Sequence, residues 1–179
     1  MQGVRLFVVL VLGAVVIGCG DSTGPEVTFP TLPAELLDAF CVRGDRTPGD
    51  AISGTISTGD CELGDGSFYE IWRLRVATTG TYRIALTSEF DNFVVLLRLE
   101  SYSGSSATLT TLASNDDSGP GLNGLIAGVA LQENLDYFLV VNGFSGDDTG
   151  PYTAEVTAVE SASVAAPLLD EGIAPKRVK

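Results

Sequence analysis

The sequence predicts an all-β protein whose strands form a sandwich or a barrel between residues 51 and 159. In this region apolar and polar residues alternate with a period of two, the pattern of strands that bury one face. Clusters of Gly, Asn, Asp, Ser and Pro separate the alternating segments at short, regular intervals. No stretch of the same region has the pattern of a long amphipathic helix.

The alternation is clearest in residues 68–99, where Gly80 supplies a turn between the first two segments. Each of these segments carries its large apolar residues on one face: Phe68, Trp72, Leu74 and Val76, then Tyr82, Ile84 and Leu86. The third run, 93–99, is apolar on both faces, so it is either central in a sheet or covered by a second layer. The same pattern predicts eight strands: 51–57, 68–76, 81–87, 92–99, 107–114, 124–131, 136–142 and 152–158.

The first 19 residues predict a lipoprotein signal peptide. Arg5 precedes an apolar run over residues 6–17, which is too short to span a bilayer but suits a signal-peptide core. The run ends in Val16-Ile17-Gly18-Cys19, which resembles the bacterial lipobox. Cys19 is therefore the expected lipidated residue. The alternatives are an ordinary secretory leader cut elsewhere or a buried apolar strand. Because Gly20 rather than Asp follows Cys19, an outer membrane is favoured if the cell has two membranes.

The segments on either side of the expected β domain have other compositions. Residues 20–35 are rich in Gly, Pro, Ser and Thr, as in a flexible tether, and residues 33–40 predict a short helix that caps one end of the core. The domain is expected over residues 36–159. Residues 160–179 form a tail without a strand pattern, in which Leu168 and Leu169 are apolar enough to dock on the domain.

Charge and composition exclude several classes of function. The formal net charge is −13, so the surface repels nucleic acid and anionic lipid headgroups. The chain has no histidine, which excludes His-based catalytic triads and His-ligated zinc. These features suit an exported protein or one that collects cations.

Two cysteines remain once Cys19 is assigned to the lipid anchor. Outside the cytoplasm such a pair predicts a disulfide, here between Cys41 and Cys61. Two thiolates alone do not make a zinc site, and their spacing is not that of a CxxC redox motif. The Arg43-Gly44-Asp45 tripeptide between them is too short to indicate adhesion, and a turn inside the disulfide loop is the favoured interpretation.

A set of short motifs, in order, resembles the bacterial pre-peptidase C-terminal domain. They are Trp72-x-Leu74, Gly80-Thr81-Tyr82, Phe90 to Leu96, Ser114 to Asp117, Asp136 to Val141, and Gly150-Pro151-Tyr152. The resemblance covers roughly residues 51–159 and implies a jelly-roll-like antiparallel β-sandwich of about eight strands. Such domains usually follow a secreted peptidase, for which this chain has no room. The resemblance therefore implies a free-standing module that binds or positions other molecules.

One group of polar side chains is a candidate calcium site: Asp91, Asn115, Asp116 and Asp117. If strands 92–99 and 107–114 pair as a hairpin, these oxygen-bearing side chains meet at one end of the sandwich, and Ca²⁺ prefers such ligands. The alternative is that the same residues only build a turn. The apolar residues Phe93, Val95 and Leu97 are either buried by a second layer or form a contact face for a protein partner.

These observations favour a non-catalytic, lipid-anchored module that binds a protein or a polysaccharide outside the cytoplasm. One alternative is a structural accessory subunit, docked to an envelope or secreted-enzyme complex through the Phe93, Val95 and Leu97 face. A small hydrolase with paired carboxylates is a poorer alternative, because the acids lie in turns without apolar neighbours that would raise a pKa. Exposed aromatic platforms for sugar are expected only at Tyr102 and Phe144.

Overall fold

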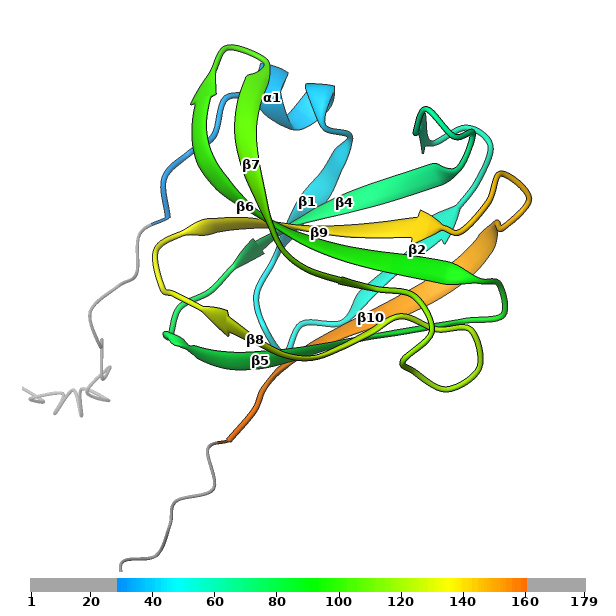
Figure 1. The fold of residues 1–179 in the computed structure, drawn as a ribbon. Coiled ribbons are helices and arrows are strands. Elements are labelled where there is room, and N and C mark those ends of the chain that lie inside the picture. Colours follow the sequence, from blue (N-terminus) through cyan, green and yellow to red (C-terminus); the bar gives the residue numbers. More distant parts are fainter. Residues whose placement is uncertain (1–28, 161–179) are drawn as a thin grey trace, which may run out of the picture.

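The computed structural model describes residues 29–160, which form two β-sheets packed face to face and one short helix (Figure 1). The predicted signal peptide with Cys19, most of the tether and the tail from residue 161 lie outside the described residues. The helix is α1 (Ala34–Ala39). The ten strands are β1 (Val42–Arg46), β2 (Ile52–Ile56), β3 (Cys61–Glu62), β4 (Phe68–Arg75), β5 (Gly80–Ser88), β6 (Asn92–Ser103), β7 (Ser106–Asn115), β8 (Leu125–Leu131), β9 (Asp136–Gly143) and β10 (Gly150–Ala158).

The strands form a six-stranded large sheet and a four-stranded small sheet. The large sheet has the order β1-β4-β9-β6-β7, with β3 paired to β4, and the small sheet has the order β2-β10-β5-β8. The predicted sandwich is confirmed, but it has ten strands rather than about eight, and β1 pairs with β4 in parallel. Strand β1 was not predicted because Val-Arg-Gly-Asp-Arg shows no apolar alternation, and β3 was not predicted because it has only two residues.

The main core lies between the two sheets and contains the residues that the alternation predicted. Leu74, Val76 and Ile84 are fully buried there, and Trp72 and Tyr82 are 7% and 5% exposed. Strand β9, in the middle of the large sheet, is buried along its whole length. Burial of this apolar surface is the dominant force that holds the sheets together.

A second apolar cluster covers the outer face of the large sheet. Leu36 of α1 is fully buried there against Ile71, Phe138 and Val140 of the sheet, and the Phe40 and Phe138 rings stack 6.2 Å apart. The helix therefore lies on a sheet face, and the expectation that it caps one end of the core is wrong. Strand β6 is central and apolar on both faces because this second layer covers it.

A buried arginine attaches the N-terminal segment to the large sheet. The Arg73 side chain is 1% exposed, and its Nε donates a hydrogen bond of 2.7 Å to Oδ1 of Asp136. Its Nη2 also donates to the carbonyl oxygen of Pro30, at 2.5 Å. Because a buried guanidinium requires a charge partner and satisfied donors, this arrangement fixes residues 29–32 on the sheet.

The predicted disulfide between Cys41 and Cys61 is confirmed, and it joins the residue before β1 to β3. Beside it, Arg43 forms ion pairs with Asp60 and, at 3.1 Å from its Nε, with Oε1 of Glu70. Tyr152 donates a hydrogen bond of 2.6 Å to the other Glu70 oxygen. The Arg43-Gly44-Asp45 tripeptide thus lies in strand β1 rather than in a turn.

No helix within residues 29–160 is long and apolar enough to cross a membrane.

Candidate binding surface at the distal loop end

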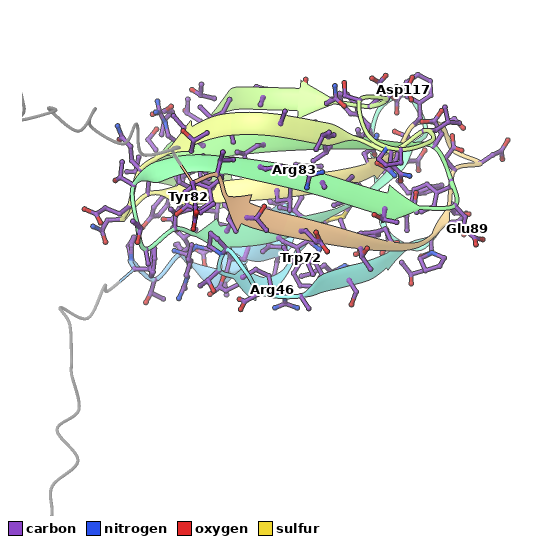
Figure 2. All side chains as sticks on the ribbon, turned by 90° about the horizontal axis from the view of Figure 1, so that it is seen from below. Arg46, Trp72, Tyr82, Arg83, Glu89 and Asp117 are labelled. Atoms are coloured by element: carbon purple, nitrogen blue, oxygen red, sulfur yellow. A yellow bond between two sulfur atoms is a disulfide. The ribbon has the colours of Figure 1, made fainter. Side chains whose placement is uncertain are left out.

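The two ends of the sandwich differ in the segments they carry. The distal loop end is formed by the loops 89–91, 116–124 and 144–149 between strands. The proximal end carries the turn 76–79, and the described chain begins and ends there, since Phe29 lies against Arg75 and Val159 bonds to Thr81. Figure 2 shows Glu89 and Asp117 at the distal loop end and Tyr82 toward the opposite end.

A buried amide network holds the distal loops in place. The Asn92 side chain is fully buried, and its Nδ2 donates to Oγ of Ser88 at 2.7 Å and to Oδ1 of Asn123 at 2.5 Å. Its Oδ1 accepts a hydrogen bond from the backbone N–H of Gly124 at 2.8 Å. Asn123 in turn donates to the carbonyl oxygen of Pro120. Because every polar group of Asn92 is used, the long loop 116–124 is anchored to the start of β6.

Two exposed apolar side chains lie on loops that are hydrogen-bonded to the backbone of Asp91 and Asn92. The Asp91 carbonyl accepts a hydrogen bond of 3.0 Å from the backbone N–H of Phe144, and the next residue, Asn92, donates one of 3.2 Å to the carbonyl of Leu122. These bonds tie the loops that carry Phe144 and Leu122 to the backbone of Asp91 and Asn92. The Phe144 side chain is nevertheless 56% exposed and that of Leu122 is 54% exposed. We call Asp91, Leu122 and Phe144 the distal patch.

Carboxylates surround the distal patch and act on Asp91. Partial burial raises the pKa of Asp91, and the nearby charges of Asp117, Asp148 and Asp116 raise that pKa further. Among the described residues, Oδ1 of Asp91 is buried and has no hydrogen-bond partner. The distal loop end therefore combines apolar contact area with an uncompensated negative field.

The structure gives turn-forming roles to some residues of the candidate calcium site. The pairing of β6 with β7 places Asn115 opposite Val94, so the hairpin brings residues 115–117 to the same end as Asp91. Asn115 Oδ1 accepts hydrogen bonds of 2.9 Å from the N–H groups of Ser118 and Leu125. Asp116 Oδ1 accepts one from Asp117 N–H. Within residues 29–160, no three or more Cys, Asp or Glu side chains form a group suited to hold a metal. Calcium binding stays a prediction.

Asp148 also belongs to this charge group, although it lies outside the hairpin of β6 and β7. It acts on Asp91 because β9 pairs with β6 so that Gly143 lies opposite Asn92, which brings the β9–β10 loop beside Asp91. Only the strand pairing, and no local motif, reveals this neighbour. Tyr102, expected in a loop, lies instead in β6 and is 45% exposed.

The expected partner face is not open in the structure. Val95 and Leu97 are half-buried and pack against the second apolar cluster under α1, and Phe93 is half-buried. A groove lies at the proximal end of the described residues, and no carboxylate lines it. It therefore lacks the paired acids that a hydrolase of the proposed kind requires.

No protein-family model matches the chain, and no curated protein matches it. The fold is similar to the pre-peptidase C-terminal domain of a Bacillus anthracis collagenase, with a TM-score of 0.44, 18% identity, and coverage of 64% of this chain and 93% of that one. It is also similar to CorA, a surface-associated copper-binding protein of Methylomicrobium album BG8, with a TM-score of 0.46, 12% identity, and coverage of 66% and 99%.

A third similar structure is PliG of Aeromonas hydrophila, a periplasmic inhibitor of g-type lysozyme. Its TM-score is 0.40 and its identity 11%, with coverage of 64% of this chain and 99% of that one. At such identities a likeness concerns the fold and transfers no ligand. The pre-peptidase C-terminal domain, which the sequence motifs resemble, is thus among the solved structures to which this β-sandwich is similar.

Proposed function

We propose that this protein is an exported, lipid-anchored, non-catalytic module that binds another protein outside the cytoplasm through the distal patch. The observation that carries the proposal is the exposure of Phe144 and Leu122 on loops whose backbone is held by hydrogen bonds. Large apolar side chains that stay exposed on ordered loops supply contact area at little ordering cost, and such loops commonly carry binding sites.

The charges around the patch define the chemistry of the partner. Asp116, Asp117 and Asp148 all act on Asp91, and the whole chain has a net charge of −13. A partner with a basic rim around an apolar centre complements this surface, because opposite charges speed the encounter and like charges oppose it. Its binding weakens as salt screens the charges.

A lipid anchor at Cys19 would attach the domain to the membrane by its proximal end, remote from the distal patch. Phe29 and the buried contact of Pro30 lie at the proximal end, beside Arg75 and Arg73. Cys19 precedes Phe29 by ten residues in the sequence. Ten extended residues span at most about 35 Å, so a lipidated Cys19 keeps the proximal end near the bilayer. In that arrangement the distal loops would lie at the end of the domain that is not tethered.

Photo-crosslinking in intact cells tests the binding surface. A photo-reactive residue in place of Phe144 should capture a discrete protein, whereas one in place of the exposed Thr153 on the outer face of β10 should not. A Leu122→Ser/Phe144→Ser variant should keep its melting temperature and lose the partner in co-purification. Equal capture from both positions, or unchanged co-purification of the double variant, would contradict the proposal.

Calcium is proposed as a stabiliser of the same end, supported by the repulsion among the carboxylates and the buried, unbonded Asp91 oxygen. Millimolar Ca²⁺ should raise the melting temperature, chelator should reverse the rise, and Mg²⁺ should do less because it demands a tighter octahedron. The rise should be smaller in Asp116→Asn. If calcium leaves the wild-type melting curve unmoved, these residues are turn formers only.

Lipid anchoring is tested separately. A Cys19→Ser variant should leave the membrane fraction and appear in the soluble fraction, because one lipidated cysteine is the proposed attachment. Membrane association that persists in this variant would show that another feature holds the protein.

A further inference from the structure

A groove with a volume of about 740 Å³ lies at the proximal end of the described residues. It is the space between the turn after β1, the β4–β5 turn and the end of β10. Its lining has no acidic or basic side chain, which is unusual in a chain with 23 Asp and Glu residues. The lining residues are Thr47, Pro48, Gly49, Ala77, Thr78, Thr79, Gly80, Thr81, Tyr82, Thr157, Ala158 and Val159.

Hydrogen bonds hold the walls of this groove. Asp50 Oδ2 accepts from the N–H of Thr47 at 2.7 Å and from its hydroxyl at 3.0 Å. The N–H of Gly49 donates to the carbonyl of Val156 at 2.9 Å, which ties this turn to β10. On the opposite wall, the Tyr82 hydroxyl donates to the carbonyl of Thr78 at 2.7 Å. The groove is therefore formed before any occupant arrives.

The chain itself leaves β10 along this groove. Val159 donates a backbone hydrogen bond of 2.8 Å to the carbonyl of Thr81, and its side chain remains 42% exposed. After Glu160 the sequence of residues 161–169 is Ser-Ala-Ser-Val-Ala-Ala-Pro-Leu-Leu, which carries no charge. Acidic residues bound this neutral segment on both sides, at Glu160 and Asp170.

We propose that residues 161–169 occupy the groove, with Leu168 and Leu169 as the apolar anchors. The neutral segment matches a neutral groove, and no carboxylate has to lose its water for the segment to bind. Leu168 lies eight positions after Glu160, which gives a reach of at most about 28 Å and allows the segment to turn back onto the wall that it leaves. Because the segment is attached at the rim, its effective concentration is on the order of millimolar, so a weak contact suffices.

Two truncated chains test this proposal against the full chain. A chain that ends at Glu160 retains every described element, and one that ends at Asp170 retains the neutral segment as well. The first should melt about 2–6 °C below the full chain, and the second should match the full chain. Amide NMR shifts of Thr47, Gly49 and residues 78–82 should change in the first truncation and stay unchanged in the second.

A point variant in the full chain separates the anchor from chain length. Leu168→Ser/Leu169→Ser should reproduce the groove shifts of the chain that ends at Glu160, whereas Lys176→Ser/Lys179→Ser should not. A synthetic peptide of residues 161–170, added to the chain that ends at Glu160, should restore the shifts of the full chain. Groove amides that ignore both truncations would overturn the proposal. Groove amides of the full chain that respond to neutral phospholipid vesicles but not to the leucine variant would overturn it too, and would make a lipid surface the occupant.

Discussion

Carboxylates near the large sheet and carboxylates at the distal loop end have opposite surroundings. Asp136 is 7% exposed, and Arg73 compensates its charge at 2.7 Å. Asp91 is surrounded by Asp117, Asp148 and Asp116, and these charges raise its pKa. The partner of a buried charge is important for stability, because its removal leaves the other charge buried without compensation. The like charges around Asp91 favour its protonated form and cost stability while Asp91 is ionised.

The region near β1 and the distal loop end also differ in the contacts that stabilise them. Near β1 the disulfide and the ion pairs of Arg43 with Asp60 and Glu70 join segments that lie far apart in the sequence. At the distal loop end the neutral amides of Asn92 and Asn123 hold the loops, and the charged side chains are left around the surface. Arginine-paired acids thus join segments near the large sheet, whereas within the described residues the acids around Asp91 form no ion pair.

Loss of the buried guanidinium should have the largest effect on stability. Arg73→Met keeps the length of the side chain but leaves Asp136 buried without its cation and frees the Pro30 carbonyl. We expect a loss of about 3–5 kcal/mol in the free energy of unfolding, measured by urea denaturation. Arg83→Met, on the outer face of β5 (Figure 2), is the control and should cost less than about 1 kcal/mol.

A double variant shows whether the charge pair itself is responsible. Arg73→Met/Asp136→Leu removes both charges and should recover part of the lost stability, because no buried carboxylate remains uncompensated. If the double variant is as unstable as the sum of the single variants, then packing or the Pro30 contact, rather than the pair, explains the effect.

Removal of the disulfide should have the next largest effect. Cys41→Ser/Cys61→Ser opens a loop with a sequence separation of 20 residues, for which the loop-entropy relation gives a loss of about 3 kcal/mol. The large sheet should open first at β1, so hydrogen exchange should rise at Val42–Arg46 more than at Asp136–Gly143 of β9. Uniform loss of protection in both strands would show that β1 does not open independently.

The sequence predicted the fold wherever local patterns carry it. Trp72, Leu74 and Tyr82 are buried as the alternation predicted, and the apolar run of β6 is indeed central and covered on both faces. Strand β1 could not be predicted, because it is stabilised by long-range contacts: the disulfide, the ladder with β4 and the Arg46 guanidinium 4.1 Å from the centre of the Trp72 ring. The β-strand propensity of individual residues contains no information on such long-range contacts.

The site was predictable only in outline. A hairpin of residues 92–99 and 107–114 predicts that Asp91 and residues 115–117 share one end, and the register of β6 and β7 agrees. The role of Asn115 in the turn could not be predicted, since the same amide suits a turn or a cation. The exposed Leu122 and Phe144 could not be predicted either, because exposure depends on how the loops meet.

The smallest expected effect, and the one that tests the contrast most directly, comes from Asp91→Asn. A raised pKa in the folded state means that the folded chain holds the Asp91 proton more tightly than the unfolded chain does. The stability that Asp91 contributes therefore falls as pH rises from its ordinary pKa of 3.8 through the raised value, and it stays reduced at neutral pH. Asparagine cannot ionise, so the variant should melt about 2–4 °C above wild type at pH 7, and this difference should vanish below about pH 4.

Asp50→Asn is the opposite control for this experiment. Hydrogen bonds from the backbone N–H and the hydroxyl of Thr47 lower the pKa of Asp50, so its contribution is present above the ordinary pKa and is lost as pH falls. The Asp50 variant should therefore melt below wild type at pH 7, and this deficit should shrink in acid. If Asp91→Asn also melts below wild type at pH 7, then Asp91 is a structural acid like Asp50. The carboxylates of the distal loop end would then need no external ligand to explain them. If the Asp91→Asn variant melts higher than wild type and loses the crosslinked partner, the lower stability of the distal loop end is the cost of an open binding surface.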